Sequence, residues 1–86
     1  MPILLNELQK VAQFIIQGKG KHGGPFRFTL PALSSTVGIP VSRCHKLVDF
    51  IDRTVGFGKM NFTLTGKNYV VFSTSLKILK MLPFSR

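Results

Sequence analysis

Hydrophobic side chains recur every three or four residues near the start of the chain, and polar side chains fill the positions between them. The apolar stripe consists of Leu4, Leu8, Val11 and Ile15, and the opposite side of Asn6, Gln9, Lys10, Gln13 and Gln17. This spacing predicts an amphipathic helix over residues 3–17. Gly18 follows directly and is a natural C-terminal stop for that helix.

A glycine-rich, basic segment comes next, over residues 18–25. Because it holds four glycines, we expect a flexible loop without regular structure. Gly18-Lys-Gly-Lys-His-Gly23 matches the G-x-G-x-x-G dinucleotide fingerprint, but it follows a helix where that fingerprint requires a strand. A basic loop fits this context better, and Lys19 and Lys21 are expected to contact phosphate groups as the loop becomes ordered on nucleic acid.

The middle of the chain predicts two helices joined by a tight turn. Residues 26–28 (Phe-Arg-Phe) alternate as a short strand does, and Thr29 is a good N-cap for a helix over residues 30–37. Residues 38–40 (Gly-Ile-Pro) form the turn, since proline is suited to the start of the next helix, over residues 41–54.

This segment places apolar and small residues at the offsets that a helix-turn-helix requires. Ser34 is small where the two helices touch, and Gly38 falls where the turn needs a positive φ. The apolar positions are Leu33, Val37, Ile39, Cys44 and Leu47. Residues 29–53 are therefore predicted to form a helix-turn-helix.

At about 100° per residue, the helix over 41–54 separates an apolar side from a polar side. The apolar side holds Cys44, Leu47, Val48 and Ile51, and the polar side Ser42, His45, Lys46, Asp49 and Arg53. A recognition helix presents such a polar side to the major groove, where Lys46 can bind guanine and Asp49 can accept from cytosine. Arg43 lies on the flank and is expected to reach the phosphate backbone. The alternative is the solvated face of an ordinary core helix.

The region after residue 58 has two interpretations. Residues 59–65 and 68–74 are rich in strand formers, and Gly66-Lys67 between them suits a two-residue hairpin turn. A long helix beginning at Gly66 is the alternative, with Tyr69, Phe72, Leu76 and Leu79 on one stripe. We favour the hairpin, followed by a short helix over residues 75–82. Lys59 and Lys67 would then lie where they can grip phosphate or a minor groove.

The charge balance narrows the choice of partner. The 86 residues make one small domain, with 12 Lys and Arg against three acids and a net charge of +9. This excess favours a polyanionic partner. Residues 29–54 carry three basic and two acidic residues, so most of the charge lies in the segments that flank the helix-turn-helix.

The sequence has few candidate residues for a disulfide, a metal site or a catalytic site. Cys44 is the single cysteine, which excludes an internal disulfide and fits a reducing compartment, and with two histidines it is one ligand short of a structural zinc site. The three acids accompany no nucleophile–base pair, so we expect neither an enzyme nor a bound cofactor or metal. No apolar run is long enough to span a membrane, and an intracellular, soluble protein is expected.

The order helix, strand, helix, turn, helix, hairpin, helix resembles the winged-helix family of DNA-binding regulators. The resemblance rests on residues 28–33 (Phe-Thr-Leu-Pro-Ala-Leu), 37–43 (Val-Gly-Ile-Pro-Val-Ser-Arg) and 47–51 (Leu-Val-Asp-Phe-Ile). It implies an α+β fold, a third helix in the major groove, and wing contacts through Lys67 and Asn68. The sequence departs from the pattern of that family at two places, the glycine-rich linker over 55–58 and the short wing tip. The small size is also similar to regulators encoded by archaeal viruses and plasmids.

We therefore expect a homodimeric transcription regulator that binds duplex DNA sequence-specifically and associates through its first and last helices. Its half-sites would lie about 34–36 Å apart. A basic RNA-binding or ribosome-associated domain is the second hypothesis, because the charge suits either nucleic acid. The amphipathic stretch over 76–82 also fits an anionic membrane surface, although a seam with the first helix is favoured.

Overall fold

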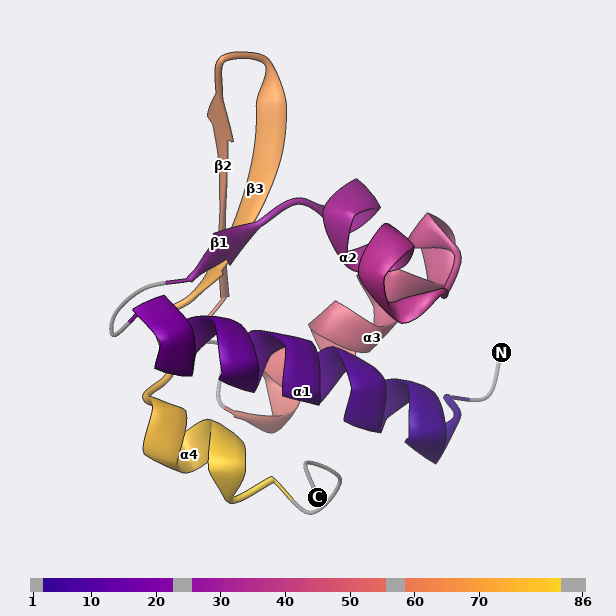
Figure 1. The fold of residues 1–86 in the computed structure, drawn as a ribbon, viewed down its shortest axis with the longest axis vertical. Coiled ribbons are helices and arrows are strands. Elements are labelled where there is room, and N and C mark those ends of the chain that lie inside the picture. The colour runs from indigo at the N-terminus through magenta and orange to yellow at the C-terminus, as the bar shows by residue number, and fades with distance from the viewer. Residues whose placement is uncertain (1–2, 23–25, 56–58, 83–86) are drawn as a thin grey trace.

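The computed structural model describes residues 3–22, 26–55 and 59–82. Within them the chain is α+β, with four helices and one three-stranded antiparallel sheet (Figure 1). The elements in order are α1 (Leu5–His22), β1 (Arg27–Phe28), α2 (Leu30–Val37), α3 (Val41–Thr54), β2 (Lys59–Leu64), β3 (Lys67–Phe72) and α4 (Leu76–Lys80). Among these described residues, no helix is both long enough and apolar enough to cross a membrane.

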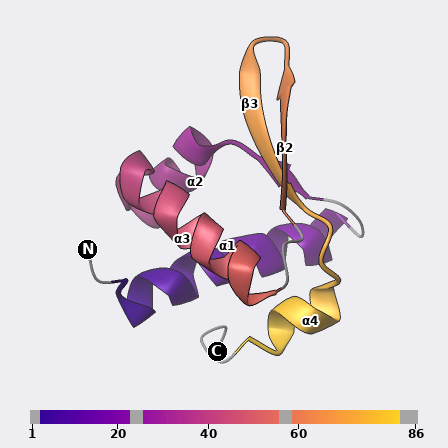
Figure 2. The same cartoon turned by 180° about the vertical axis from the view of Figure 1, so that it is seen from behind.

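The sheet has the strand order β1-β3-β2, with β3 in the centre. β2 and β3 pair along their whole length, from Lys59 opposite Phe72 to Leu64 opposite Lys67, while β1 pairs only with the last part of β3. Val70 and Phe72 are buried on one face of β3, against the helices. The far end of the β2–β3 hairpin rises beyond the helices as an arm (Figures 1 and 2).

The hairpin confirms the strand interpretation of residues 59–72 and contradicts the long helix. Residues 69–72 (Tyr-Val-Val-Phe) are strand formers, and pairing on both sides of β3 satisfies their backbone groups. The turn, however, is one residue earlier than predicted. Thr65 and Gly66 form it with φ values of 50° and 78°, the left-handed pair that a tight two-residue hairpin turn uses.

The first helix is longer than the sequence predicted, because α1 continues through Gly18 and Gly20 to His22. The prediction of a loop over residues 18–22 was therefore wrong, and residues 23–25 lie outside the described part of the chain. Two tertiary contacts account for the extension. The ring of Phe26 lies where a Cβ of Gly18 would be, and the Lys19 ammonium donates to the carbonyl oxygen of Phe72 at 2.8 Å.

The core lies between α1, the helix-turn-helix and the inner face of the sheet. Its most deeply buried large side chains include Val11, Ile15, Leu33, Ile51 and Phe72. α4 begins at the Ser75 N-cap, and it packs against α1 of the same chain with Leu79 fully buried. The result is a helical body from which the hairpin and the outer side of α3 both project (Figure 2).

Candidate nucleic-acid interface

The helix α3 buries one side and exposes the other. Its buried side chains are Cys44, Leu47, Val48 and Ile51, as the sequence predicted. Its exposed side chains include Ser42, His45, Lys46 and Arg53, and Asp49 is partly exposed. The apolar residues thus attach α3 to the core and leave a polar face available to a partner.

A shared acceptor fixes the junction between α2 and α3. The Ser34 hydroxyl donates to the carbonyl oxygen of Ile39 at 2.5 Å, and the Cys44 thiol donates to the same oxygen at 3.4 Å. Gly38 has a φ of 74°, and its N–H closes the end of α2 on the Ser34 carbonyl at 2.9 Å. The predicted positive φ at Gly38 is confirmed, and Ser34 contributes a hydrogen bond in addition to its small size.

Arg43 turns away from the exposed face of α3. Its guanidinium forms an ion pair with the carboxylate of Glu7 on α1, and only 13% of the Glu7 side chain is exposed. Charge-assisted pairs of this kind are among the stronger side-chain contacts. Arg43 therefore holds α3 against α1, and it would have to leave Glu7 to reach the phosphate predicted from the sequence.

Asp49 lies at the centre of a network that joins α3 to the hairpin. One carboxylate oxygen pairs with the Lys59 ammonium, and the other lies 3.2 Å from Nδ1 of His45. The backbone N–H of Lys59 donates to Asp52 at 2.7 Å. Since the Lys59 side chain is only 14% exposed, this lysine fixes the base of the hairpin on α3. The structure thus brings three predicted site residues together: His45, Asp49 and Lys59.

Lys19 and Lys21, for which the sequence predicted a loop, both lie in α1 but differ in their surroundings. Lys19 is partly buried, and its ammonium is held by the Phe72 carbonyl oxygen. Burial lowers the pKa of Lys19, because desolvation disfavours the charged form. Lys21 is exposed near the end of α1.

A groove of about 480 Å³ separates the start of α3 from the hairpin. Its lining includes Val41 and His45 on the helix side and Asn61, Thr63 and Asn68 on the hairpin side. Asn68 and Thr63 are joined by a 2.9 Å hydrogen bond across the strands. At the tip, Lys67 is exposed. The groove therefore offers amide and hydroxyl groups among apolar side chains, and Lys67 lies outside its lining.

The sequence reasoning missed Val41, Asn61, Thr63 and Arg27 as surface candidates. Asn61 and Thr63 alternate along β2, so their common face can be read from the sequence once the hairpin is accepted. The sequence pattern predicts for Arg27 only a place in a short strand. Its guanidinium lies over the Tyr69 ring, 5.7 Å from the centroid, a contact that depends on the pairing of β1 with β3.

The electrostatics follow from the positions of the three carboxylates. Glu7 and Asp49 are paired with cations, and Asp52 accepts from a backbone N–H. Exposed basic side chains remain on α1, the sheet, α3 and α4, including Lys21, Arg27, Lys46, Arg53, Lys67 and Lys77. With its acids already engaged, the surface is well suited to a polyanion.

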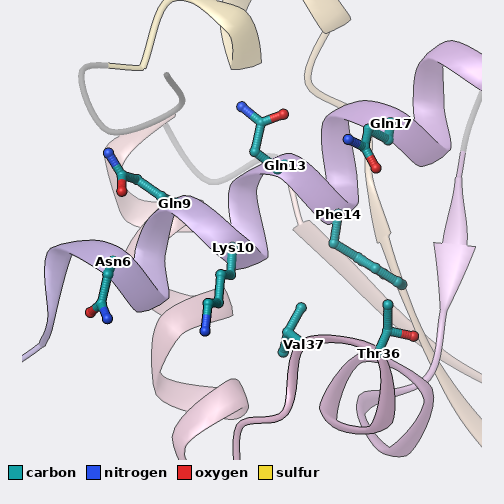
Figure 3. Close-up of a pocket in the computed structure, with 8 residues that line it drawn as sticks. All are labelled: Asn6, Gln9, Lys10, Gln13, Phe14, Gln17, Thr36 and Val37. Atoms are coloured by element: carbon teal, nitrogen blue, oxygen red, sulfur yellow. The ribbon is translucent and has the colours of Figure 1, made fainter.

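A second groove, of about 530 Å³, runs between α1 and α2. Figure 3 shows Phe14 and Lys10 on the side of α1 that faces Thr36 and Val37. Amide side chains of α1 form much of the remaining lining: Asn6, Gln9, Gln13 and Gln17. The groove has no carboxylate, thiol or imidazole in its lining, so Lys10 is the one acid–base side chain that lines it. Elsewhere in the described ranges, no cluster of three or more His, Cys, Asp or Glu could hold a metal ion.

No protein-family model matches the chain, and neither a curated protein nor a solved structure shows significant similarity to it.

Proposed function

We propose that this chain is a winged-helix protein that binds duplex DNA sequence-specifically and acts as a small transcription regulator, with α3 in the major groove. The observation that carries the proposal is the exposed polar face of α3, formed by Ser42, His45, Lys46 and Arg53, of which His45 also lines the groove beside the hairpin. A major groove accepts a single helix, and side chains of these types can hydrogen-bond to base edges and phosphates.

The topology supports this assignment. The sheet, of strand order β1-β3-β2, takes one strand from before the helix-turn-helix and two strands from after it. The β2–β3 hairpin lies where a winged helix has its wing. The shared hydrogen bonds at Ile39 hold the two helices at their junction. The Asp49–Lys59 pair ties the hairpin to α3. A DNA partner would therefore meet α3 and the hairpin as one preformed surface.

Within this proposal, base reading and phosphate contact fall to different residues. Ser42, His45 and Lys46, which are exposed on α3, would read bases, and Lys67 with Asn68 would contact the backbone or minor groove from the hairpin. Asp49 has its charge compensated by Lys59, which lowers its repulsion of phosphate. Arg43, Lys59 and Lys19 serve mainly to hold the elements together.

The proposed active form is a homodimer that associates through α1 and α4. Apolar side chains on both helices remain exposed although α4 already packs on α1 of its own chain. The largest exposures are 60% for Leu5 and 73% for Met81, directly after α4. Light scattering is expected to give the mass of two chains, and a monomer at all concentrations would contradict this part of the proposal.

A competition between duplex DNA and structured RNA tests the function. We expect duplex DNA to win at about 150 mM salt, where non-specific binding is weak. Lys46→Gln should reduce duplex binding more than Lys77→Gln does, although both variants lose one exposed cation. Preferential binding of RNA would instead support an RNA-binding or ribosome-associated domain. Binding to neither nucleic acid would refute both.

A further inference from the structure

The outer face of the sheet, turned away from the helices, carries a row of planar side chains. Phe62 on β2 and Tyr69 on β3 are direct cross-strand partners, and their rings stack with centroids 5.4 Å apart and an interplanar angle of 19°. On the other side of β3, the Arg27 guanidinium of β1 lies over the Tyr69 ring. Because the strand order is β1-β3-β2, the three groups form one row across the sheet. We call it the planar row.

Apolar side chains extend this face along the hairpin. Met60 and Leu64 alternate with Phe62 on β2, and their exposed fractions are 62% and 45%. Alternation along a strand places all three on the same face. By contrast, the inner face carries the buried Val70 and Phe72. The exposed apolar surface is therefore a continuous feature of the outer face.

The charge of this face is entirely positive within the described residues. Arg27 lies at one end of the planar row, and Lys67 lies opposite Leu64 near the hairpin tip. The carboxylates Glu7, Asp49 and Asp52 lie on α1 and α3, where they are already engaged. A second copy of the chain would bring like charges together on this face. A polyanion with apolar faces complements it instead.

A hollow of about 710 Å³ adjoins the Arg27 end of the row. Its lining includes Arg27, Lys67 and Tyr69, together with Phe14, Phe26 and Phe28. Volumes of this size are typical of small-molecule and cofactor sites, which combine aromatic walls with a few polar groups. It therefore has space for a nucleotide beside the planar row.

We propose that this outer face binds single-stranded nucleic acid, with unpaired bases stacking on the two ends of the planar row, the Phe62 ring and the Arg27 guanidinium, and phosphates close to Arg27 and Lys67. Aromatic rings and guanidinium planes are the surfaces on which proteins stack unpaired bases, and such stacking tolerates any base sequence. The planar row is separate from the outer side of α3, and Lys67 at the hairpin tip is the residue that both proposed sites share. The proposal does not depend on duplex binding.

Tyrosine fluorescence gives a direct test, since the chain has one tyrosine and no tryptophan. We expect an oligothymidylate of about 12 nucleotides, within the ~4–16 nucleotides typical of stacking sites, to quench the emission of Tyr69. Phe62→Leu keeps the fluorophore and removes a ring from the row. It should weaken oligothymidylate binding by about five- to 150-fold, the range for losing one stacked base, and leave duplex binding unchanged.

Charge-matched variants separate stacking from general attraction. Arg27→Gln should weaken oligothymidylate binding more than Lys77→Gln, which removes an exposed cation from α4. Lys46→Gln should weaken duplex binding and preserve the quenching of Tyr69, so failure of either proposal is visible without the other. Unchanged Tyr69 emission at saturating oligothymidylate would overturn the inference. A second result would also overturn the inference: Phe62→Leu converts a dimer to a monomer but leaves the affinity for oligothymidylate unchanged. The outer face would then be the contact surface for a second copy of the chain.

Discussion

Gly18 and Gly20 lie two residues apart on α1, yet their replacement by Ala is expected to have opposite effects on stability. A Cβ on Gly18 would lie 2.3 Å from Cε2 of Phe26, far inside van der Waals contact. A Cβ on Gly20 would meet Leu76 Cδ2 at 3.9 Å, which is an ordinary contact. Neither glycine has a positive φ, so backbone strain does not enter the comparison.

The magnitudes follow from two competing terms. Replacing a helical glycine by Ala stabilises a helix by about 0.8–1 kcal/mol. Gly20→Ala should gain close to this amount. At Gly18 the gain is opposed by overpacking against the Phe26 ring, which also contacts Phe14 and Phe28 at centroid separations of 5.5 and 5.6 Å. Overpacking costs about 1–3 kcal/mol, so Gly18→Ala should lose about 1 kcal/mol net.

Thermal unfolding followed by circular dichroism measures the difference. The two variants should differ by about 2 kcal/mol, or roughly 8–16 °C in Tm for a domain of this size. A Phe26→Ala background supplies the control, because Gly18→Ala should become stabilising once the ring is removed. If Gly18→Ala raises the Tm of the otherwise unchanged protein as much as Gly20→Ala does, the proposed reason for the extension of α1 is wrong.

Two further predictions concern the contacts around α3. Glu7→Gln removes the charge that pairs with Arg43. Because the guanidinium is partly exposed, we expect the free energy of unfolding, measured in urea, to fall by only about 1–2 kcal/mol. An unchanged urea midpoint would contradict a structural role for the pair. Burial, and secondarily the negative charge of Glu7, raises the pKa of the fully buried Cys44 thiol. The buried, neutral Cys44 thiol therefore contributes its full stabilisation below ~8.5, the thiol pKa in the unfolded chain. This stabilisation is lost as pH rises through the higher pKa that the thiol has in the folded chain. Urea midpoints between about pH 8 and 10 should fall more steeply for the wild type than for Cys44→Ala, and parallel curves would count against this assignment.

The helix-turn-helix could be predicted from the sequence because its determinants are local. The apolar period of α3, the Thr29 N-cap and the positive φ of Gly38 all follow from residues within a few positions of one another. The Thr29 hydroxyl indeed accepts from the N–H of Ala32 at 3.2 Å. The hairpin was predicted for the same reason, from the strand preferences of residues 69–72.

The remainder depends on contacts between distant residues. α1 extends past Gly18 because Phe26 packs on it and because Lys19 binds a carbonyl 53 residues later. Neither cause can be read from the helical pattern itself. The hairpin turn is displaced by one residue because pairing along β2 and β3 sets its register, which places Leu64 opposite Lys67 and leaves Thr65 in the turn.

The candidate interface shows the same division. Sequence periodicity identified Ser42, His45 and Lys46 on the exposed side of α3. It could not show that Arg43 pairs with a carboxylate 36 residues earlier, or that Lys59 pairs with Asp49. Arg43 and Lys59, which the sequence predicts to contact phosphate, instead pair with carboxylates and join elements of the fold.

Selection of bound sites from a random pool of duplex DNA tests the central claim most directly, with the wild type, Lys46→Ala and Lys67→Ala compared. The wild type should select a defined site. Lys46→Ala should relax base preference at discrete positions, since a good base contact contributes about 1–3 kcal/mol of discrimination. Lys67→Ala should select the same site with lower affinity and a salt dependence reduced by about one phosphate contact. Selection of no defined site by the wild type, or identical behaviour of the two variants, would contradict sequence reading by α3.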